Sequence, residues 1–253
     1  MKLLVLTGCN GQIGQSIISK LNNENWFIIG VDVSQQSPIE NYNFDYVRGS
    51  VSEKKTWESV FKKISQLIND EIKHMSLINN AGIAVFTPSE ERTIDEFNNI
   101  MQTNFYGPVL GMTSFFEFLS NSKICKNSKE IKKSIVNIAS IYGNFSPNPS
   151  IYENSKRISS EVYGASKAAL IQATKYFAIR YGKIPIAINS LSPGGVLNEV
   201  LQTENFIKRY SELVPQGRMC EPEEVAEMIN GILKMPIYCT GQNFLLDGGM
   251  SSW

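Results

Sequence analysis

The sequence predicts an α/β fold in which a doubly wound parallel sheet of about seven strands forms a single domain over residues 1–253. Short, nearly continuous apolar runs alternate along the chain with longer stretches in which apolar residues recur at helical spacing. Such runs are typical of parallel strands that helices bury on both faces. The chain is 42% hydrophobic and shows no linker-like break, so its 253 residues can bury one large core.

The alternation gives each element an expected place. The expected strands are the apolar runs at residues 3–6, 26–31, 46–47, 77–78, 135–138, 186–191 and 244–246. The expected helices are the amphipathic stretches at residues 13–21, 55–68, 94–119, 163–181 and 223–233. Residues 143–162, rich in Asn, Ser and Pro, and the mixed stretch 194–217 do not fit this pattern. Both follow strands, so we expect them at the carboxyl edge of the sheet, where open α/β folds bind ligands.

The composition excludes several classes of partner. Lys plus Arg and Asp plus Glu number 24 each, so the chain has no excess positive charge for nucleic acid or an anionic membrane. No apolar run approaches the ~18 residues of a membrane span. The four cysteines are far apart, which predicts reduced thiols in a cytoplasmic protein and neither a metal site nor a disulfide framework.

A phosphate-binding loop is predicted where the first strand ends. Residues 7–14 read Thr-Gly-Cys-Asn-Gly-Gln-Ile-Gly and lead into a helical stretch. Glycines let the backbone turn tightly against a pyrophosphate, and the helix N-terminus offers free N–H groups and partial positive charge. This order of strand, loop and helix is that of Rossmann-type nucleotide-binding folds. The loop residues expected to contact a dinucleotide are Gly8, Asn10, Gly11, Gln12, Ile13 and Gly14.

Asp32 favours NAD over NADP as the dinucleotide. It ends the second apolar run, 18 residues after Gly14, where an acidic side chain can accept hydrogen bonds from a ribose diol. A 2′-phosphate at the same place would be repelled by the carboxylate and would need a basic partner. No Lys or Arg occurs between Lys20 and Arg48. The sequence therefore favours NAD over NADP.

Taken together, these and further residues resemble the short-chain dehydrogenase/reductase family over nearly the whole chain. Besides the loop at residues 7–14, the resemblance rests on Asn79-Asn80-Ala81-Gly82, Asn104, Ser140, Tyr163-Gly-Ala-Ser-Lys167, Pro193-Gly194 and Asp247-Gly248-Gly249. The resemblance implies a Rossmann-type fold and hydride transfer between a nicotinamide and an alcohol or carbonyl carbon.

Some residues depart from the family pattern. The glycines at 8, 11 and 14 have the spacing of the extended, sugar-nucleotide-modifying branch, and Gln12 stands where the single-domain branch has its middle glycine. The chain length, the Asn-Asn-Ala-Gly motif and the Asp-Gly-Gly ending resemble the single-domain branch, which we expect. Ser50-Val51 stands where relatives often place Asp-Val against the adenine, and Asn198 stands where many have Thr.

Two Tyr-x-x-x-Lys pairs, Tyr152–Lys156 and Tyr163–Lys167, compete for the role of acid/base. Residues four apart share a helix face, so either lysine could favour the phenolate and lower the pKa of its tyrosine. Tyr163 opens a stretch with apolar residues on one helical face, whereas Tyr152 follows a Pro- and Asn-rich segment typical of turns. The interval from Tyr163 to Pro193 also resembles that of the family. We therefore expect Tyr163 to be the acid/base, after an insertion that follows Ser140.

The resemblance implies roles for the remaining site residues. Ser140 would hydrogen-bond the reacting oxygen, Asn104 would relay protons through water, and Lys167 would support Tyr163 and hold the nicotinamide ribose. His74, the only histidine, has no partner in view and is expected to be structural. Further residues expected to bind the cofactor, alongside Tyr163 and Lys167, are Ser50, Val51, Asn80, Ala81, Gly82, Pro193, Gly194 and Val196.

The expected function is that of an NAD(H)-dependent oxidoreductase that interconverts an alcohol and a carbonyl. The stretch at residues 143–162 carries side chains suited to a hydroxylated or anionic ligand, namely Asn144, Asn148, Tyr152, Glu153, Asn154, Lys156 and Arg157. The Ile-Tyr-Gly after Ser140, the Tyr-containing insertion and the terminal Ser-Ser-Trp resemble oxidoreductases of bacterial nonulosonic-acid and other surface-glycan pathways. A sugar or sugar derivative is therefore one expected substrate.

Three other functions stay open, and one partner is expected. The alternatives are a 3-oxoacyl-carrier-protein reductase, a non-catalytic NAD sensor, and a sugar-nucleotide epimerase or dehydratase. Besides a small-molecule substrate, we expect further copies of the chain as partners. Residues 94–119 and 163–181 are apolar on more than one face, which predicts a homodimer or homotetramer.

Overall fold

The computed structural model describes residues 1–39, 43–69, 71–122, 125, 130–152 and 158–252. Within these ranges seven strands form one parallel sheet in the order β3-β2-β1-β4-β5-β6-β7. The strands are β1 (Lys2–Thr7), β2 (Trp26–Asp32), β3 (Phe44–Arg48), β4 (His74–Asn79), β5 (Lys132–Ile138), β6 (Ile186–Pro193) and β7 (Asn243–Leu246). The expected doubly wound, Rossmann-type sheet is thus confirmed.

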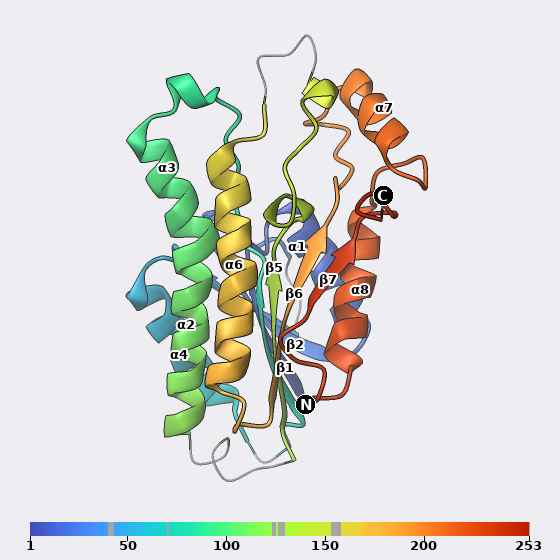
Figure 1. Ribbon diagram of the computed structural model, residues 1–253. Coiled ribbons are helices and arrows are strands. Elements are labelled where there is room, and N and C mark those ends of the chain that lie inside the picture. The colour runs from blue at the N-terminus through green and yellow to red at the C-terminus, as the bar shows by residue number, and fades with distance from the viewer. Residues whose placement is uncertain (40–42, 70, 123–124, 126–129, 153–157, 253) are drawn as a thin grey trace.

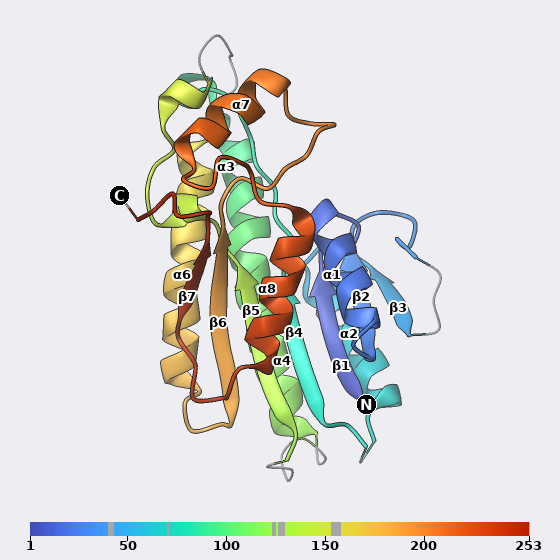
Figure 2. The same ribbon diagram turned by 90° about the vertical axis from the view of Figure 1, so that its right-hand side faces the viewer.

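Helices cover both faces of this sheet (Figures 1 and 2). They are α1 (Gln12–Asn22), α2 (Lys54–Leu67), α3 (Ile94–Met101), α4 (Gly107–Asn121), α6 (Glu161–Arg180), α7 (Glu204–Leu213) and α8 (Pro222–Lys234). Helices α2, α4 and α6 bury one face, α1 and α8 bury the other, and α7 lies above the carboxyl edge. None of the helices in the described ranges is long and apolar enough to cross a bilayer.

The sequence of β1 shows how one strand serves both layers. Leu3 and Val5 join the core under α2, α4 and α6, whereas Leu4 and Leu6 join the core under α1 and α8. Alternate side chains of a strand point to opposite faces, so a run of apolar residues is what a doubly covered strand requires. All four side chains are at most 1% exposed.

The prediction of one continuous helix over residues 94–119 is wrong, because a π-helical turn interrupts it. The chain forms α3, then a π-helical turn at Gln102–Tyr106, and then α4. Pro108, at the start of α4, has no N–H with which to continue the helical hydrogen bonds. The Gly107 N–H donates to the carbonyl of Gln102, five residues earlier, as in a π-helix. This turn carries the buried Asn104.

The described residues of the two stretches outside the simple pattern lie at the carboxyl edge of the sheet, as expected (Figure 1). Residues 149–152 form a short 3-10 turn. The stretch at 194–217 contains α7, a helix that was not expected, whose first turn is capped by Thr203 Oγ1 accepting from the N–H of Phe206.

Candidate active site

The site begins between β1 and β4, where the strand order reverses and open α/β sheets bind ligands. Gly8 adopts a φ of +65°, and a Cβ there would lie 2.7 Å from Ala81 Cα. A Cβ at Gly14 would collide with the carbonyl oxygen of Gly8. Both positions therefore require glycine, one for its backbone angle and one for the close packing of loop on helix.

Two loops of this edge are bonded to one another. Thr7 Oγ1 accepts from the N–H groups of Asn80 and Ala81, at 3.0 Å each. Asn80 Nδ2 donates to the carbonyls of Thr7 and Gly8. These bonds align the glycine loop with the Asn-Asn-Ala-Gly segment along one wall of an elongated cavity.

Asp32 lies at the end of β2 on the same cavity. Its Oδ2 accepts from the N–H of Asn10 at 3.1 Å, and its Oδ1 accepts from the N–H and the hydroxyl of Ser34. Arg48 pairs opposite Asp32 in the sheet, so a basic residue does lie near the carboxylate, contrary to the sequence reading. Its side chain is exposed and donates to the carbonyl of Val33.

The cavity beside Asp32 measures about 540 Å³. Of the expected cofactor residues it is lined by Gly8, Asn10, Gly11, Gln12, Ile13, Asp32, Ser50, Val51, Asn80, Ala81 and Gly82. A glycine cradle that leaves no room for a Cβ, the N-terminus of α1 and a carboxylate at the strand end fit the phosphates and the ribose of a dinucleotide. Residues not foreseen on this wall are Val31, Val33, Ser34, Gly49, Ile83 and Thr103.

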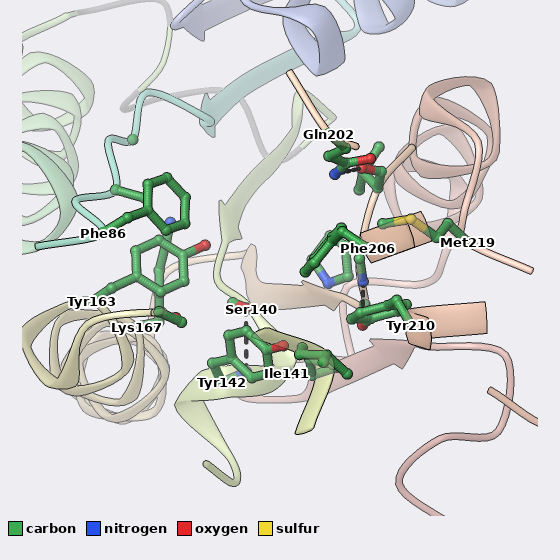
Figure 3. A pocket seen from close by; sticks show the side chains of 18 of the residues that line it. Phe86, Ser140, Ile141, Tyr142, Tyr163, Lys167, Gln202, Phe206, Tyr210 and Met219 are labelled. Carbon is green, nitrogen blue, oxygen red and sulfur yellow. Dashed lines mark hydrogen bonds between the residues drawn. The ribbon is translucent and has the colours of Figure 1, made fainter. Parts of the chain in front are cut away.

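A second cavity of about 650 Å³ continues from it. It is lined by the expected residues Ile13, Asn80, Gly82, Ser140, Tyr163, Lys167, Pro193, Gly194 and Val196. In Figure 3 the ring of Tyr163 points into this space, with Lys167 beside it and Ser140 below. Expected site residues that line neither cavity are Gly14 and Asn104.

Local structure sets the position of Tyr163 at the start of α6. The Ser160 hydroxyl caps the helix by accepting from the Tyr163 N–H at 3.2 Å, and Ser166 Oγ donates to the Tyr163 carbonyl at 2.7 Å. Gly164 lets the helix approach the turn after β5, since a Cβ there would lie 2.9 Å from the Tyr142 carbonyl oxygen. The phenol of Tyr163 thereby lies close enough to the Ser140 hydroxyl for Ser140 to act on its pKa.

Burial raises the pKa of the Tyr163 phenol, and the nearby Ser140 hydroxyl opposes this only in part. The lowered pKa expected from the sequence is therefore wrong for the protein without ligands, because loss of water outweighs the neighbouring groups. Burial also lowers the pKa of Lys167 to about 8. The Lys167 ammonium lies 5.8 Å from the centre of the Tyr163 ring and donates to the Ile138 carbonyl at 2.8 Å.

Asn104 lies behind these residues. Its amide accepts from the Ile83 N–H and donates to the Ile83 carbonyl, both at 2.8 Å, and it donates to Ser166 Oγ at 3.2 Å. A Cβ at Gly82 would lie 3.3 Å from Lys167 Nζ and 3.5 Å from Asn104 Oδ1. Asn104 thus holds the segment that follows Gly82 against the helix that carries Lys167.

The competing tyrosine, Tyr152, lines the same cavity from the 3-10 turn and is 7% exposed. Its partner in the motif, Lys156, lies outside the described residues, as do Glu153, Asn154 and Arg157. Within the described residues, Tyr152 ends a 3-10 turn at residues 149–152. Tyr163 and Lys167, in contrast, share the first turns of α6.

Sequence reasoning missed part of the second cavity. The residues not foreseen there include Phe86, Tyr142, Ile151, Phe206, Tyr210 and Met219. Thr203 followed by apolar residues at helical spacing, Phe206, Ile207 and Tyr210, is a signal that could have found α7. Only the fold shows that this helix faces the cavity.

Comparisons with known proteins agree with this geometry. The family model described as enoyl-(acyl carrier protein) reductase matches residues 9–251. A tropinone reductase homolog of Arabidopsis thaliana is 28% identical, over 99% of this chain and 76% of its own. The 3-oxoacyl-(acyl-carrier-protein) reductase of Vibrio cholerae is 27% identical, over 98% of this chain and 97% of its own.

Solved structures of similar fold contain nicotinamide cofactors. A short-chain dehydrogenase of Leptospira borgpetersenii with bound NAD+ is 31% identical, with a TM-score of 0.83 over 99% of this chain and 92% of its own. ElxO with bound NADP is 23% identical, with a TM-score of 0.82 over 100% of this chain and 99% of its own, and shows the shared fold. Both cofactors thus occur among proteins of this fold.

Proposed function

The chain belongs to the short-chain dehydrogenase/reductase family, and we propose that it interconverts an alcohol and a carbonyl with NAD(H) as its preferred cofactor and Tyr163 as its acid/base. One observation carries the proposal. The Tyr163 phenol, the Ser140 hydroxyl and the Lys167 ammonium converge on the wall of a cavity that continues into the glycine-lined cradle.

A bound nicotinamide would supply or accept the hydride. In the reduction of a carbonyl, the Tyr163 hydroxyl would give its proton to the carbonyl oxygen as the carbon takes up the hydride, and in the oxidation of an alcohol both transfers would be reversed. Ser140 positions the reacting oxygen by hydrogen bonding. The raised pKa of Tyr163 keeps the phenol protonated at neutral pH, which suits it to donate a proton to a carbonyl.

Lys167 supports the phenolate that remains after proton transfer. Its ammonium lies near the ring and is held by the Ile138 carbonyl, so its charge is positioned before the reaction begins. Pro193, Gly194 and Val196 would hold the nicotinamide, and Asn80 and its neighbours would hold the adenosine ribose. The positions of these residues along the two cavities support these roles.

Asp32 supports the preference for NAD. Its carboxylate is fixed by Asn10 and Ser34 at the end of β2, where a 2′-phosphate would meet a negative charge. Arg48 is nearby, but its guanidinium donates to the Val33 carbonyl. The NAD+ bound to the Leptospira relative also supports this choice.

Calorimetric titration with the two reduced cofactors tests the preference. We expect NADH to bind at least tenfold more tightly than NADPH, a difference of about 1.4 kcal/mol. Asp32→Ser should reduce that ratio at least tenfold by removing the negative charge. Glu58→Gln, which removes an exposed carboxylate on α2, is the matched control and should leave the ratio unchanged. Equal or reversed affinities in the wild-type protein would refute the preference.

A second candidate function is the reduction of a 3-oxoacyl thioester, because the Vibrio cholerae reductase matches nearly the whole chain. Incubation with NADH and a panel of ketones, sugars and thioesters distinguishes reduction of a 3-oxoacyl thioester from reduction of another carbonyl compound. The sugar substrate and the surface-glycan role stay predictions. The cytoplasmic location also stays a prediction.

A further inference from the structure

The second cavity has an aromatic wall, which we define as Tyr142, Tyr152, Phe206 and Tyr210. The ring centres of Tyr152 and Phe206 are 5.7 Å apart, and those of Phe206 and Tyr210 are 5.9 Å apart. Tyr142 lies close enough to Tyr152 and Tyr210 for both to act on the pKa of its phenol. Three separate segments therefore build one continuous surface of flat rings.

Part of this aromatic wall, formed by Phe206 and Tyr210, stands across the cavity from the proposed acid/base. Figure 3 shows Phe206 and Tyr210 on one side and Phe86, Tyr163 and Lys167 on the other. A substrate whose reacting carbon lies at Tyr163 must place the rest of its body against these rings.

The aromatic wall is anchored, so it is a preformed surface. Tyr210 is 2% exposed, and its hydroxyl accepts from the Gly195 N–H at 2.5 Å. Arg209 donates from α7 to the Ser150 carbonyl at 3.0 Å and so joins α7 to the turn that carries Tyr152. A rigid apolar surface loses little entropy when a ligand binds to it.

The charged side chains that line the second cavity bear on which substrates can bind there. Among the described residues that line this cavity, Lys167 is the only one with a charged side chain. Its ammonium already donates to the Ile138 carbonyl. Gln202 is also engaged, donating to the Val196 carbonyl and accepting from the Asn198 N–H. A carboxylate or phosphate at the aromatic wall would lose its water without gaining a cation from the described lining residues, which weakens its binding.

We infer that the substrate is an uncharged ketone or secondary alcohol with a compact, apolar, ring-containing body that packs against the aromatic wall. This inference rests on the proposed function, and it narrows the substrate class. It differs from the hydroxylated or anionic ligand expected from the sequence. A compact apolar ring can lie flat against aromatic side chains, and burial of that apolar surface favours binding.

The first test compares two ketones that differ at one group, 4-propylcyclohexanone and 3-(4-oxocyclohexyl)propanoate, in which a carboxylate replaces the terminal methyl. Oxidation of NADH reports turnover. We expect kcat/KM to be at least tenfold higher for the neutral ketone. Glucose and a 3-oxobutanoyl pantetheine thioester serve as polar and acyl-chain comparisons. Equal or higher kcat/KM with the carboxylate, the sugar or the thioester would overturn the inference.

Variants of Phe206 test the aromatic wall itself. Phe206→Ala should raise KM for the neutral ketone about tenfold and change kcat much less, because the ring contacts the body of the substrate and not the reacting atoms. Phe206→Lys should reverse the order of the two ketones by adding a cation. Tyr238→Ala, at a 99% exposed ring, is the control and should change neither value. NADH affinity checks that each variant is folded, and an unchanged KM in folded Phe206→Ala contradicts the inference.

A binding measurement separates this inference from the proposed function. Tyr163→Phe loaded with NADH should bind the neutral ketone at least tenfold more tightly than the carboxylate in calorimetry. Selective binding without turnover in the wild-type protein would refute the proposed function and keep the inference. Absence of selective binding would refute the inference, whatever the turnover.

Discussion

At the scale of single residues, His74 shows how burial sets chemistry. It lies at the amino-terminal end of β4, and its Nε2 hydrogen-bonds Ser134 Oγ at 2.9 Å and Ser76 Oγ at 3.1 Å. Its ring lies 4.7 Å from that of Trp26. Burial, and then the positive charges of Lys132 and Lys2, lower the pKa of His74 to about 3. The imidazole is thus held neutral, away from both cavities.

This lowered pKa predicts loss of stability in acid. In the unfolded chain His74 binds a proton below its ordinary pKa of 6.5. In the folded protein it binds that proton only near pH 3. Stability should therefore fall as the pH falls through this window, by at most about 1.4 kcal/mol per pH unit from this residue. Urea unfolding at pH 7 and pH 5 measures the fall, which should be smaller in His74→Gln. An equal fall in both proteins would contradict the predicted role of His74.

At the scale of elements, the site depends on how closely the turn after β5 packs on α6. The 3-10 turn Ile141–Gly143 begins directly after Ser140, and a Cβ at Gly143 would lie 2.8 Å from the carbonyl carbon of Lys167. This carbon and the Ala168 nitrogen, 2.9 Å from the same Cβ, are backbone atoms of α6. Neither can move aside without displacing a site residue. Close packing of these two elements holds Ser140 against Tyr163.

Gly143→Ala should therefore damage stability and activity together. We expect the free energy of unfolding to fall by about 1–3 kcal/mol, the usual cost of overpacking, and turnover to fall at least tenfold. Gly231→Ala is the matched control, because no atom lies within 4 Å of its added Cβ. In the interior of α8 this change should add about 0.5–1 kcal/mol. Denaturant unfolding and steady-state assays measure both, and a Gly143→Ala variant equal to wild type would exclude this packing role.

Elements with a strong local signal could be predicted from the sequence. The apolar runs predicted all seven strands, because a strand covered on both faces must be apolar throughout. The π-turn between α3 and α4 was missed because apolar spacing barely changes across it, although Pro108 was a local sign of an interrupted ladder. Helix α7 was missed because the segment before it is irregular.

At the scale of the whole molecule, the site depends on contacts between distant segments. The glycine loop and Asp32 could be predicted because their signal lies within one strand–helix–strand unit. The aromatic wall could not, since it joins residues 142, 152, 206 and 210 only after folding. Arg48 was overlooked for the same reason, because strand pairing places it opposite Asp32.

The outer surface predicts assembly with further copies of the chain. Large apolar side chains are exposed on α3, the π-turn and α6, at Ile94, Phe97, Tyr106, Tyr176 and Ile179. Helices α3 and α6 pack against each other. Phe115, Phe116 and Phe177, on the other faces of α4 and α6, are buried in the core.

We expect light scattering at micromolar concentration to give the mass of a homodimer or homotetramer. Ile179 is 84% exposed, and Ile179→Glu should shift the mass toward the monomer by placing a charge in the interface. Val200→Glu changes a side chain that is 92% exposed outside these helices, and should not alter the mass. A wild-type monomer would refute the prediction.

The central claim is that Tyr163 moves the proton, and the most direct measurement is single-turnover reduction by Tyr163→Phe. The change removes only the hydroxyl, so the rate should fall by ~10²–10⁴-fold while NADH affinity stays nearly unchanged. Tyr152→Phe should mainly raise the KM of the substrate, and Lys167→Ala should reduce both the rate and cofactor binding. A Tyr163→Phe protein that reduces its substrate at the wild-type rate, or loss of the reaction in Tyr152→Phe alone, would contradict the account.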